Sequence, residues 1–140
     1  MIPLFTSIIA ITIAAGILLM DATTAEIYTE RAGILNLGLE GMMLMGAVTA
    51  FATVYHTGSL LLAVLLAMLV GMVLAAIHAF LSITMRANQV VSGLSVTLFG
   101  TGFASFLGQR LGPAANGHYL AGLSAERFHR VAIPGLSDIP

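Results

Sequence analysis

The charged residues of this chain are gathered into a few short segments, with long hydrophobic stretches between them. Residues 2–20, 41–85 and 87–109 contain no Asp, Glu, Lys or Arg. A helix needs about 20 mainly apolar residues to cross the roughly 30 Å hydrocarbon core of a membrane. The first and third stretches each match one such helix. The longer middle stretch matches two, because a polar turn at residues 55–59 divides it. We therefore predict membrane spans at about 2–20, 34–55, 60–84 and 89–109.

These spans are expected to be α-helices, because lipid offers no hydrogen-bond partner to backbone groups. A strand of a membrane barrel would alternate apolar and polar residues, whereas residues 60–70 are apolar throughout. The predicted fold class is therefore all-α: a polytopic integral membrane helix bundle with about four transmembrane helices. Residues 110–140 contain many Gly and Pro residues, and we expect a loop-like extracytoplasmic tail there. Residues 1–140 would then form one partial membrane-spanning domain.

The composition supports this class and excludes several others. Charged residues make up only 8% of the chain, against about 25% in a typical soluble domain. A soluble enzyme is therefore not expected. A net charge of −1 provides no broad basic surface for nucleic acid. Without Cys there is no disulfide framework and no thiolate metal site. We expect the lipid bilayer as a partner, and we expect no metal.

The distribution of Arg gives two answers about orientation. Arg31 and Arg86 fall in loops on one predicted side, and the positive-inside rule places that side in the cytoplasm and the N-terminus outside. Arg110, Arg127 and Arg130 follow the last span and favour the opposite orientation. No basic residue precedes Arg31, so the first stretch is expected to be a retained span and not a cleaved signal peptide.

Small residues recur at every fourth position of the third predicted span, at Ala63, Ala67, Gly71 and Ala75. Such residues let neighbouring helices approach closely in lipid, so we expect them, together with Gly93, to pack helices. His78 lies on nearly the same face. We expect a neutral histidine that is hydrogen-bonded to another helix, with a role in a solute pathway or proton relay as the alternative.

The fourth predicted span carries a polar row, formed by Gln89, Gly93, Thr97, Thr101, Ser105 and Gln109. Polar side chains at regular spacing are unfavourable against lipid, so this row is expected to face other helices or a wet cavity. It either joins helices by hydrogen bonds or offers hydrogen bonds to a polar solute. Under the second interpretation the candidate pathway-lining residues are Asn36, Gln89, Ser92, Thr97 and Thr101.

The second predicted span has an irregular start, because residues 33–41 include three glycines and one Asn. Asn36 is expected to cap a helix that begins at Leu37. Glu40 would then lie in the first turn, where the helix dipole favours an anion. We expect Glu40, Arg31 and Arg86 to be structural or coupling charges, with Glu40 paired to one of the two arginines.

Two segments resemble signatures of a known family. Residues 30–47 have the sequence ERAGILNLGLEGMMLMGA, and residues 86–94 have the sequence RANQVVSGL. Both resemble the permease subunits of bacterial ABC importers for nucleosides and simple sugars, in the branched-chain amino acid/ribose permease superfamily. Family members are typically longer, so the chain resembles an N-terminal half.

The resemblance implies a subunit of the bacterial inner (plasma) membrane, with its N-terminus outside, that imports solute by alternating access. Its implied partners are an ABC ATPase subunit, a second permease subunit and an extracytoplasmic solute-binding protein. ATP hydrolysis would belong to the ATPase subunit, so no catalytic residue and no cofactor are expected in this chain.

Two other functions are compatible with the residues. The first is a small self-contained proton-coupled transporter that uses Glu40 as its proton site. A proton-coupling acid belongs near the middle of its helix, whereas Glu40 lies near an end of the predicted span. The second is a non-transporting membrane assembly protein, held to its partners by the row of small residues.

Overall fold

The computed structural model describes residues 2–110, which form four α-helices and one π-helical turn. The elements are α1 (Ile2–Arg31), α2 (Leu39–Thr57), α3 (Leu60–Ala79), η1 (Phe80–Thr84) and α4 (Gln89–Arg110). No strand occurs within residues 2–110, which confirms the all-α class. The tail predicted after Arg110 falls outside the described residues.

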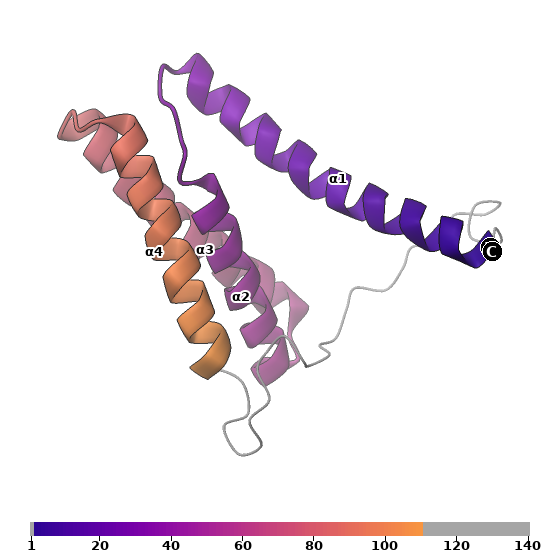
Figure 1. Ribbon diagram of the computed structural model, residues 1–140. Helices are drawn as coiled ribbons and strands as arrows, with labels where there is room; N and C mark the ends of the chain where they lie inside the picture. The colour runs from indigo at the N-terminus through magenta and orange to yellow at the C-terminus, as the bar shows by residue number, and fades with distance from the viewer. Residues whose placement is uncertain (1, 111–140) are drawn as a thin grey trace.

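Three of the helices form a bundle, and α1 diverges from it (Figure 1). Helix α2 packs against both α3 and α4 and is the central element. The core lies where these three helices meet and consists of Met42, Met45, Leu74, Val96 and Ala104. By contrast, the most apolar window of α1 has no buried residue.

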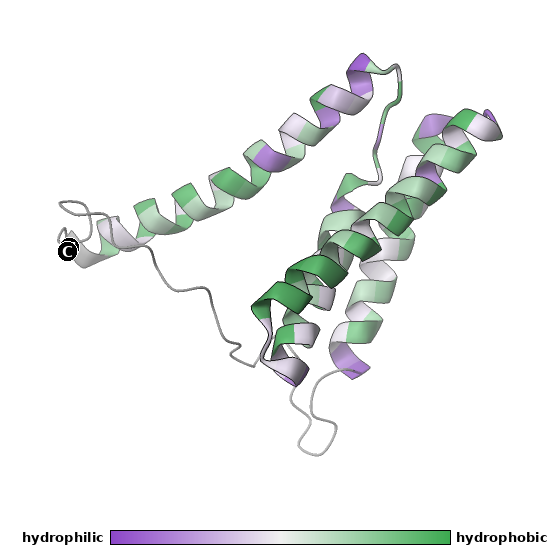
Figure 2. Ribbon diagram, turned by 180° about the vertical axis from the view of Figure 1, so that it is seen from behind, coloured by the Kyte–Doolittle hydropathy of each residue, from purple (hydrophilic) through white to green (hydrophobic). Residues whose placement is uncertain are grey.

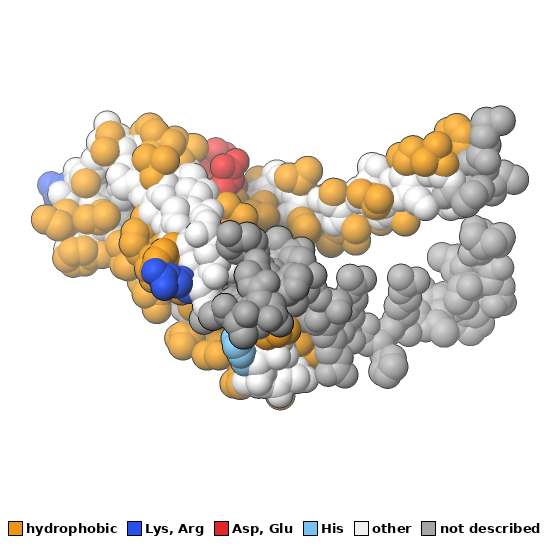
Figure 3. Space-filling model, turned by 60° about the horizontal axis from the view of Figure 1, so that its bottom comes forward, with side chains coloured by type: hydrophobic (Ala, Val, Ile, Leu, Met, Phe, Trp, Pro, Cys, Tyr) orange, Lys and Arg blue, Asp and Glu red, His pale blue; other side chains and the backbone are white. Residues whose placement is uncertain are grey.

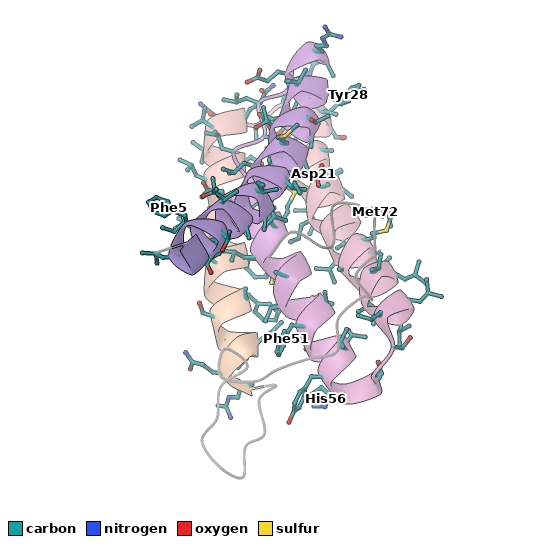
Figure 4. All side chains as sticks on the ribbon, turned by 90° about the vertical axis from the view of Figure 1, so that its right-hand side faces the viewer. Phe5, Asp21, Tyr28, Phe51, His56 and Met72 are labelled. Atoms are coloured by element: carbon teal, nitrogen blue, oxygen red, sulfur yellow. The ribbon has the colours of Figure 1, made fainter. Side chains whose placement is uncertain are left out.

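Many large hydrophobic side chains are exposed. Hydrophobic residues run along the helices (Figure 2), and hydrophobic side chains gather on the face seen in Figure 3. Phe5, Tyr28 and Met72 project outward and are 64%, 72% and 58% exposed (Figure 4). Monomeric soluble proteins rarely show continuous apolar surface on this scale. The helical segments Leu4–Arg31, Leu60–Thr84 and Gln89–Arg110 are long and apolar enough to cross a membrane. The chain is therefore a multi-pass membrane protein.

Helix α1 extends beyond its predicted span. We expected the span to end at residue 20, but the helix continues without a break to Arg31. Its 30 residues measure about 45 Å, more than the roughly 30 Å of hydrocarbon. The charged side chains of Asp21, Glu26 and Glu30 all lie in this last part. Charge ends the hydrophobic stretch but does not end a helix, so hydropathy alone placed the end too early.

The ends of the helices follow local backbone chemistry. Gly33 has a φ of 81° and ends α1: its N–H bonds the Glu30 carbonyl at 2.9 Å, and the N–H of Ile34 bonds the Thr29 carbonyl at 3.0 Å. This pair of bonds is a Schellman motif, and the left-handed conformation favours glycine. Gly58 ends α2 in the same conformation, within the predicted polar turn.

Helix α2 is shorter than its predicted span. It has 19 residues, begins at Leu39, and is not among the helices that are apolar enough to qualify as spans by themselves. The prediction that Asn36 caps a helix beginning at Leu37 was therefore wrong: Gly38 occupies the N-cap position and provides no side-chain cap. Helix α2 contacts both α3 and α4, and the part of its surface that they cover can carry more polar residues than a lipid-facing surface.

Candidate functional site

The segment between α1 and α2, residues 32–38, is not helical, and we call it the linker. Gln89 at the start of α4 holds its backbone. The Gln89 Oε1 atom accepts a hydrogen bond from the Leu35 N–H at 2.8 Å, and Nε2 donates to the Gly33 carbonyl at 3.2 Å. Non-helical backbone inside a membrane protein must find such partners, because lipid provides none.

A second contact with the linker lies two turns further along α4. The Thr97 hydroxyl donates to the Leu37 carbonyl at 2.6 Å. Between these two contacts, a Cβ atom on Gly93 would lie only 2.8 Å from the Leu37 nitrogen. A glycine at position 93 therefore allows the linker backbone to lie directly against α4. Three members of the predicted polar row thus face the linker.

His78 connects three segments. Its side chain is 3% exposed, with Nε2 3.3 Å from the Leu35 carbonyl oxygen and Nδ1 3.1 Å from the Ser92 hydroxyl oxygen. A carbonyl oxygen only accepts, so Nε2 carries a proton; in the neutral ring Nδ1 then accepts from the Ser92 hydroxyl. His78 of α3 therefore bonds both α4 and the linker, as expected of a histidine that joins helices.

Two side chains arrange the linker next to α1. The Asn36 Oδ1 atom accepts from the Gly38 N–H at 3.1 Å, which forms an Asx turn leading into α2. The Asn36 N–H donates to Glu26 Oε1 at 3.0 Å, and the Thr29 hydroxyl donates to Glu26 Oε2 at 3.2 Å. Glu26 is absent from the sequence-based candidates, because no local spacing signals its contact with the linker.

Helices α2 and α4 cross where glycines allow backbone to meet backbone. A Cβ atom on Gly41 would lie 2.7 Å from the Thr97 Cα atom, and one on Gly100 would lie 2.6 Å from the Gly41 carbonyl oxygen. A Cβ atom on Gly38 would lie 3.0 Å from Val96 Cγ1. Small residues at a helix crossing allow this close packing in membranes.

The second signature segment, residues 86–94, builds the start of α4. The Asn88 Oδ1 atom accepts from the backbone N–H groups of Val90 and Val91, at 3.0 and 3.2 Å, and so caps the helix. Gln89, Ser92 and Gly93 then make the contacts described above. The two signature segments therefore pack on each other through the linker.

The other predicted residues lie outside this cluster. The Thr101 hydroxyl donates to the Leu98 carbonyl of its own helix at 3.1 Å. In the small-residue row, Ala63 is buried, Ala75 is exposed, and Gly71 has open space within 4 Å of an added Cβ atom. A Cβ atom on Gly46 of α2 would lie 3.9 Å from the Ala67 carbonyl. Solute lining and packing against further helices remain predictions.

Glu40 lies in the first turn of α2, as expected, and its side chain is exposed. Arg31 and Arg86 are exposed as well. Within residues 2–110, Glu40 forms no ion pair with either arginine, so the expected pairing does not occur there. Glu40 sits at a helix end, whereas the proton-coupled alternative requires an acid near the middle of a helix. A structural or coupling role for these three charges remains a prediction.

An all-α membrane bundle with an interrupted helix start, held by polar side chains of its neighbours, is typical of membrane transport proteins. Residues 7–126 match the family described as "Branched-chain amino acid transport system / permease component". The chain belongs to this family. No solved structure matches it significantly.

Three curated relatives are similar to parts of the chain. TsgC13 of Haloferax volcanii, provisionally named as a glucose ABC transporter permease, is 46% identical over 97 residues, covering 69% of this chain and 30% of the relative. The guanosine ABC transporter permease NupQ of Bacillus subtilis is 32% identical over 120 residues, covering 81% and 36%. The nucleoside ABC transporter permease NupC of Lactococcus lactis is 31% identical over 95 residues, covering 64% and 30%. The chain thus spans about a third of the length of these relatives.

Proposed function

We propose that the chain forms part of the permease of an ATP-driven ABC importer, which moves a nucleoside or a simple sugar across the inner membrane. The observation that carries this proposal is the agreement among the relatives. All three are named as ABC transporter permeases, for glucose, guanosine and nucleosides respectively. These solutes are rich in hydroxyl or amide groups and carry no charge that would require an ionic partner.

The proposal includes partners that a permease needs for ATP-driven import. These are an ABC ATPase subunit, a second permease subunit and an extracytoplasmic solute-binding protein. The energy of ATP hydrolysis would enter through the ATPase, so this chain contributes the membrane path and no hydrolytic chemistry.

We propose that the N-terminus lies outside the cell. The end of α1 with Arg31 and the α3–α4 connection with Arg86 lie at the same end of the molecule, and Arg110 ends α4 at the opposite end (Figure 1). The positive-inside rule favours the two-arginine end as cytoplasmic. This count covers residues 2–110; Arg127 and Arg130 lie outside them.

The linker gives the proposed transport cycle a physical requirement. The hydrogen-bonding groups of Gln89, Ser92 and Thr97 are occupied by the linker backbone and His78. The groups of Gln89 and Thr97 that bond the linker become available to a solute when the linker moves away from α4. Alternating access, in which helices rock around a polar site, provides such a movement.

The proposal is tested by disrupting the gene in its native host and measuring uptake of radiolabelled guanosine, glucose and leucine. We expect guanosine or glucose uptake to fall to background and to return when the gene is supplied on a plasmid. Leucine tests the solute class that the family description names, and a fall in leucine uptake alone would contradict the nucleoside or sugar proposal. Unchanged guanosine and glucose uptake, in cells where the wild-type protein is detectably expressed, would contradict the proposal for these solutes.

A further inference from the structure

The start of α2 lies well inside the bundle, at the level of the middle of α4. A Cβ atom on Gly41 would lie 2.7 Å from the Thr97 Cα atom, and one on Gly100 would lie 2.6 Å from the Gly41 carbonyl oxygen. Thr97 and Gly100 are the ninth and twelfth of the 22 residues of α4, which begins at Gln89. At roughly 1.5 Å per residue, they lie about 12 and 17 Å from the start of this span. Glu40 precedes Gly41, so it lies well inside the membrane although it is in the first turn of its helix.

Glu40 and Thr101 lie on the same side of the crossing between α2 and α4. The two helices run in the same direction away from the linker (Figure 1), and successive residues are turned by about 100° around each helix. The residue before Gly41 and the residue after Gly100 therefore point to one side of the crossing. Met42 points to the other side, where it packs into the core with a residue of α3. Glu40 and Thr101 thus point away from α3.

Both side chains keep free hydrogen-bonding capacity at this depth. The Glu40 side chain is exposed, and within residues 2–110 it forms neither a hydrogen bond nor an ion pair. Thr101 is half-buried, and its hydroxyl donates to the Leu98 carbonyl at 3.1 Å, which leaves the hydroxyl oxygen able to accept. A charged side chain that faces lipid inside the membrane is unfavourable, so such residues face water-filled cavities or polar partners and mark functional sites.

The free groups of this pair are acceptors, which limits the ligand that they fit. An ionised carboxylate only accepts, and the Thr101 oxygen accepts while its proton is bonded to its own helix. A ligand that touches both must therefore supply hydrogen-bond donors. Hydroxyl groups on a sugar ring are donors of this kind, whether the ring is a free sugar or the ribose of a nucleoside. Gln89 and Thr97 differ from this pair, because the linker backbone occupies them.

We propose that Glu40 and Thr101 bind the sugar-ring hydroxyl groups of the transported solute, on a water-filled path along the side of α2 and α4 that points away from α3. This inference rests on the proposed import of a nucleoside or simple sugar, and it adds two side chains that hold the solute. The site requires an acceptor oxygen at position 40 and not a charge. It therefore differs from proton coupling, which requires an ionisable group.

The first test asks whether water reaches both positions. The sequence contains no Cys, so Glu40→Cys and Thr101→Cys each introduce a single thiol. Membranes of the native host are treated with a charged methanethiosulfonate, which reacts with thiolates in water. The control is Leu98→Cys, because Leu98 is 73% exposed on the same helix and points about 160° away from Gly100. We expect both test positions to react about tenfold faster than the control, because a thiol in lipid does not ionise.

The second test separates the acceptor from the charge. A host strain without the gene receives the wild type or a variant on a plasmid, and the uptake rates of guanosine and glucose are compared at equal protein levels. Glu40→Leu and Thr101→Val each leave a solute hydroxyl without its partner, so each should lower the uptake rate about tenfold. Glu40→Gln and Thr101→Ser keep an acceptor oxygen and should restore uptake to nearly the wild-type rate.

Three results would overturn the inference. The first is labelling at either test position that is no faster than at Leu98→Cys; a basic partner that covers Glu40 would give this result. The second is wild-type uptake in both Glu40→Leu and Thr101→Val. The third is loss of uptake in Glu40→Gln, which would assign proton coupling to Glu40. Failure of the proposed function is a separate outcome, because it appears as absence of guanosine and glucose uptake by the wild type, whereas the labelling is read without transport.

Discussion

Helix α2 can cross α4 closely because Gly100 has no side chain. The substitution Gly100→Ala, which adds one methyl group, tests this crossing. An added Cβ atom at this position would lie 2.6 Å from the Gly41 carbonyl oxygen and 2.7 Å from both the carbonyl carbon and Cα of Gly41. Ordinary van der Waals contact begins at 3.4 Å, so the helices must separate by about 0.8 Å. All three atoms are backbone atoms, so rotation of a side chain cannot relieve the clash.

This geometry sets the expected change in the free energy of unfolding for Gly100→Ala. Overpacking of a well-packed interior costs about 1–3 kcal/mol, and backbone contact places this case near 3 kcal/mol. The higher helix propensity of Ala returns about 1 kcal/mol. We therefore expect the free energy of unfolding to fall by about 2 kcal/mol, or roughly 30-fold in the folding equilibrium constant.

The assay is reversible unfolding of the purified chain in mixed micelles, titrated with sodium dodecyl sulfate and followed by circular dichroism. Gly102→Ala is the matched control, because it makes the same substitution on the same helix and has nothing within 4 Å of the new Cβ atom. We expect it to be neutral or stabilising by up to about 1 kcal/mol. Equal free energies of unfolding for the two variants would refute the close crossing.

Three further predictions concern the side chains around the linker. Gln89→Met should lower the free energy of unfolding by about 1–3 kcal/mol, because the Leu35 N–H and the Gly33 carbonyl lose their partner. Its control in the same titration is Gln109→Met, which makes the same substitution at an exposed position. Glu26→Ala should speed hydrogen–deuterium exchange at the Asn36 amide, whereas Glu26→Gln keeps an acceptor oxygen and should exchange at nearly the wild-type rate. Equal exchange rates in both variants would contradict the hydrogen bond between Glu26 and the linker. Glu40→Gln should leave solute uptake unchanged, and loss of uptake at normal protein levels would make Glu40 a coupling residue.

The helical architecture was predictable because lipid imposes a length and a polarity on every segment that crosses it. The prediction of a span at 60–84 coincides with α3 and η1, and the span at 89–109 differs from α4 by one residue. His78 was expected to bond another helix, since a polar side chain in lipid needs a partner. Its bonds to Ser92 and Leu35 confirm that expectation.

The sequence did not reveal which groups form hydrogen bonds with these polar side chains. Gln89 and Thr97 stand on one helix face, but that spacing does not reveal their partners in the linker. Gln89 accepts from the Leu35 N–H, 54 positions away, and Thr97 donates to the Leu37 carbonyl, 60 positions away. The bond between Glu26 and Asn36 depends on how the chain turns after α1. The π turn at Ser82 likewise leaves no hydropathy signal, because π and α windings of an apolar segment contain the same residues.

The central claim is that the end of the linker and the start of α2 lie directly on α4. It is tested most directly by disulfide formation between Gly38→Cys and Val96→Cys in the naturally Cys-free chain. A Cβ atom at position 38 lies 3.1 Å from Val96 Cβ, within a few tenths of an ångström of the 3.5–4.5 Å typical of disulfides. The control pair is Gly38→Cys with Leu98→Cys, since Leu98 is 73% exposed on α4. We predict rapid, nearly complete oxidation of the first pair in lipid nanodiscs and none of the second. No disulfide in the first pair, or equal rates in both, would contradict the account.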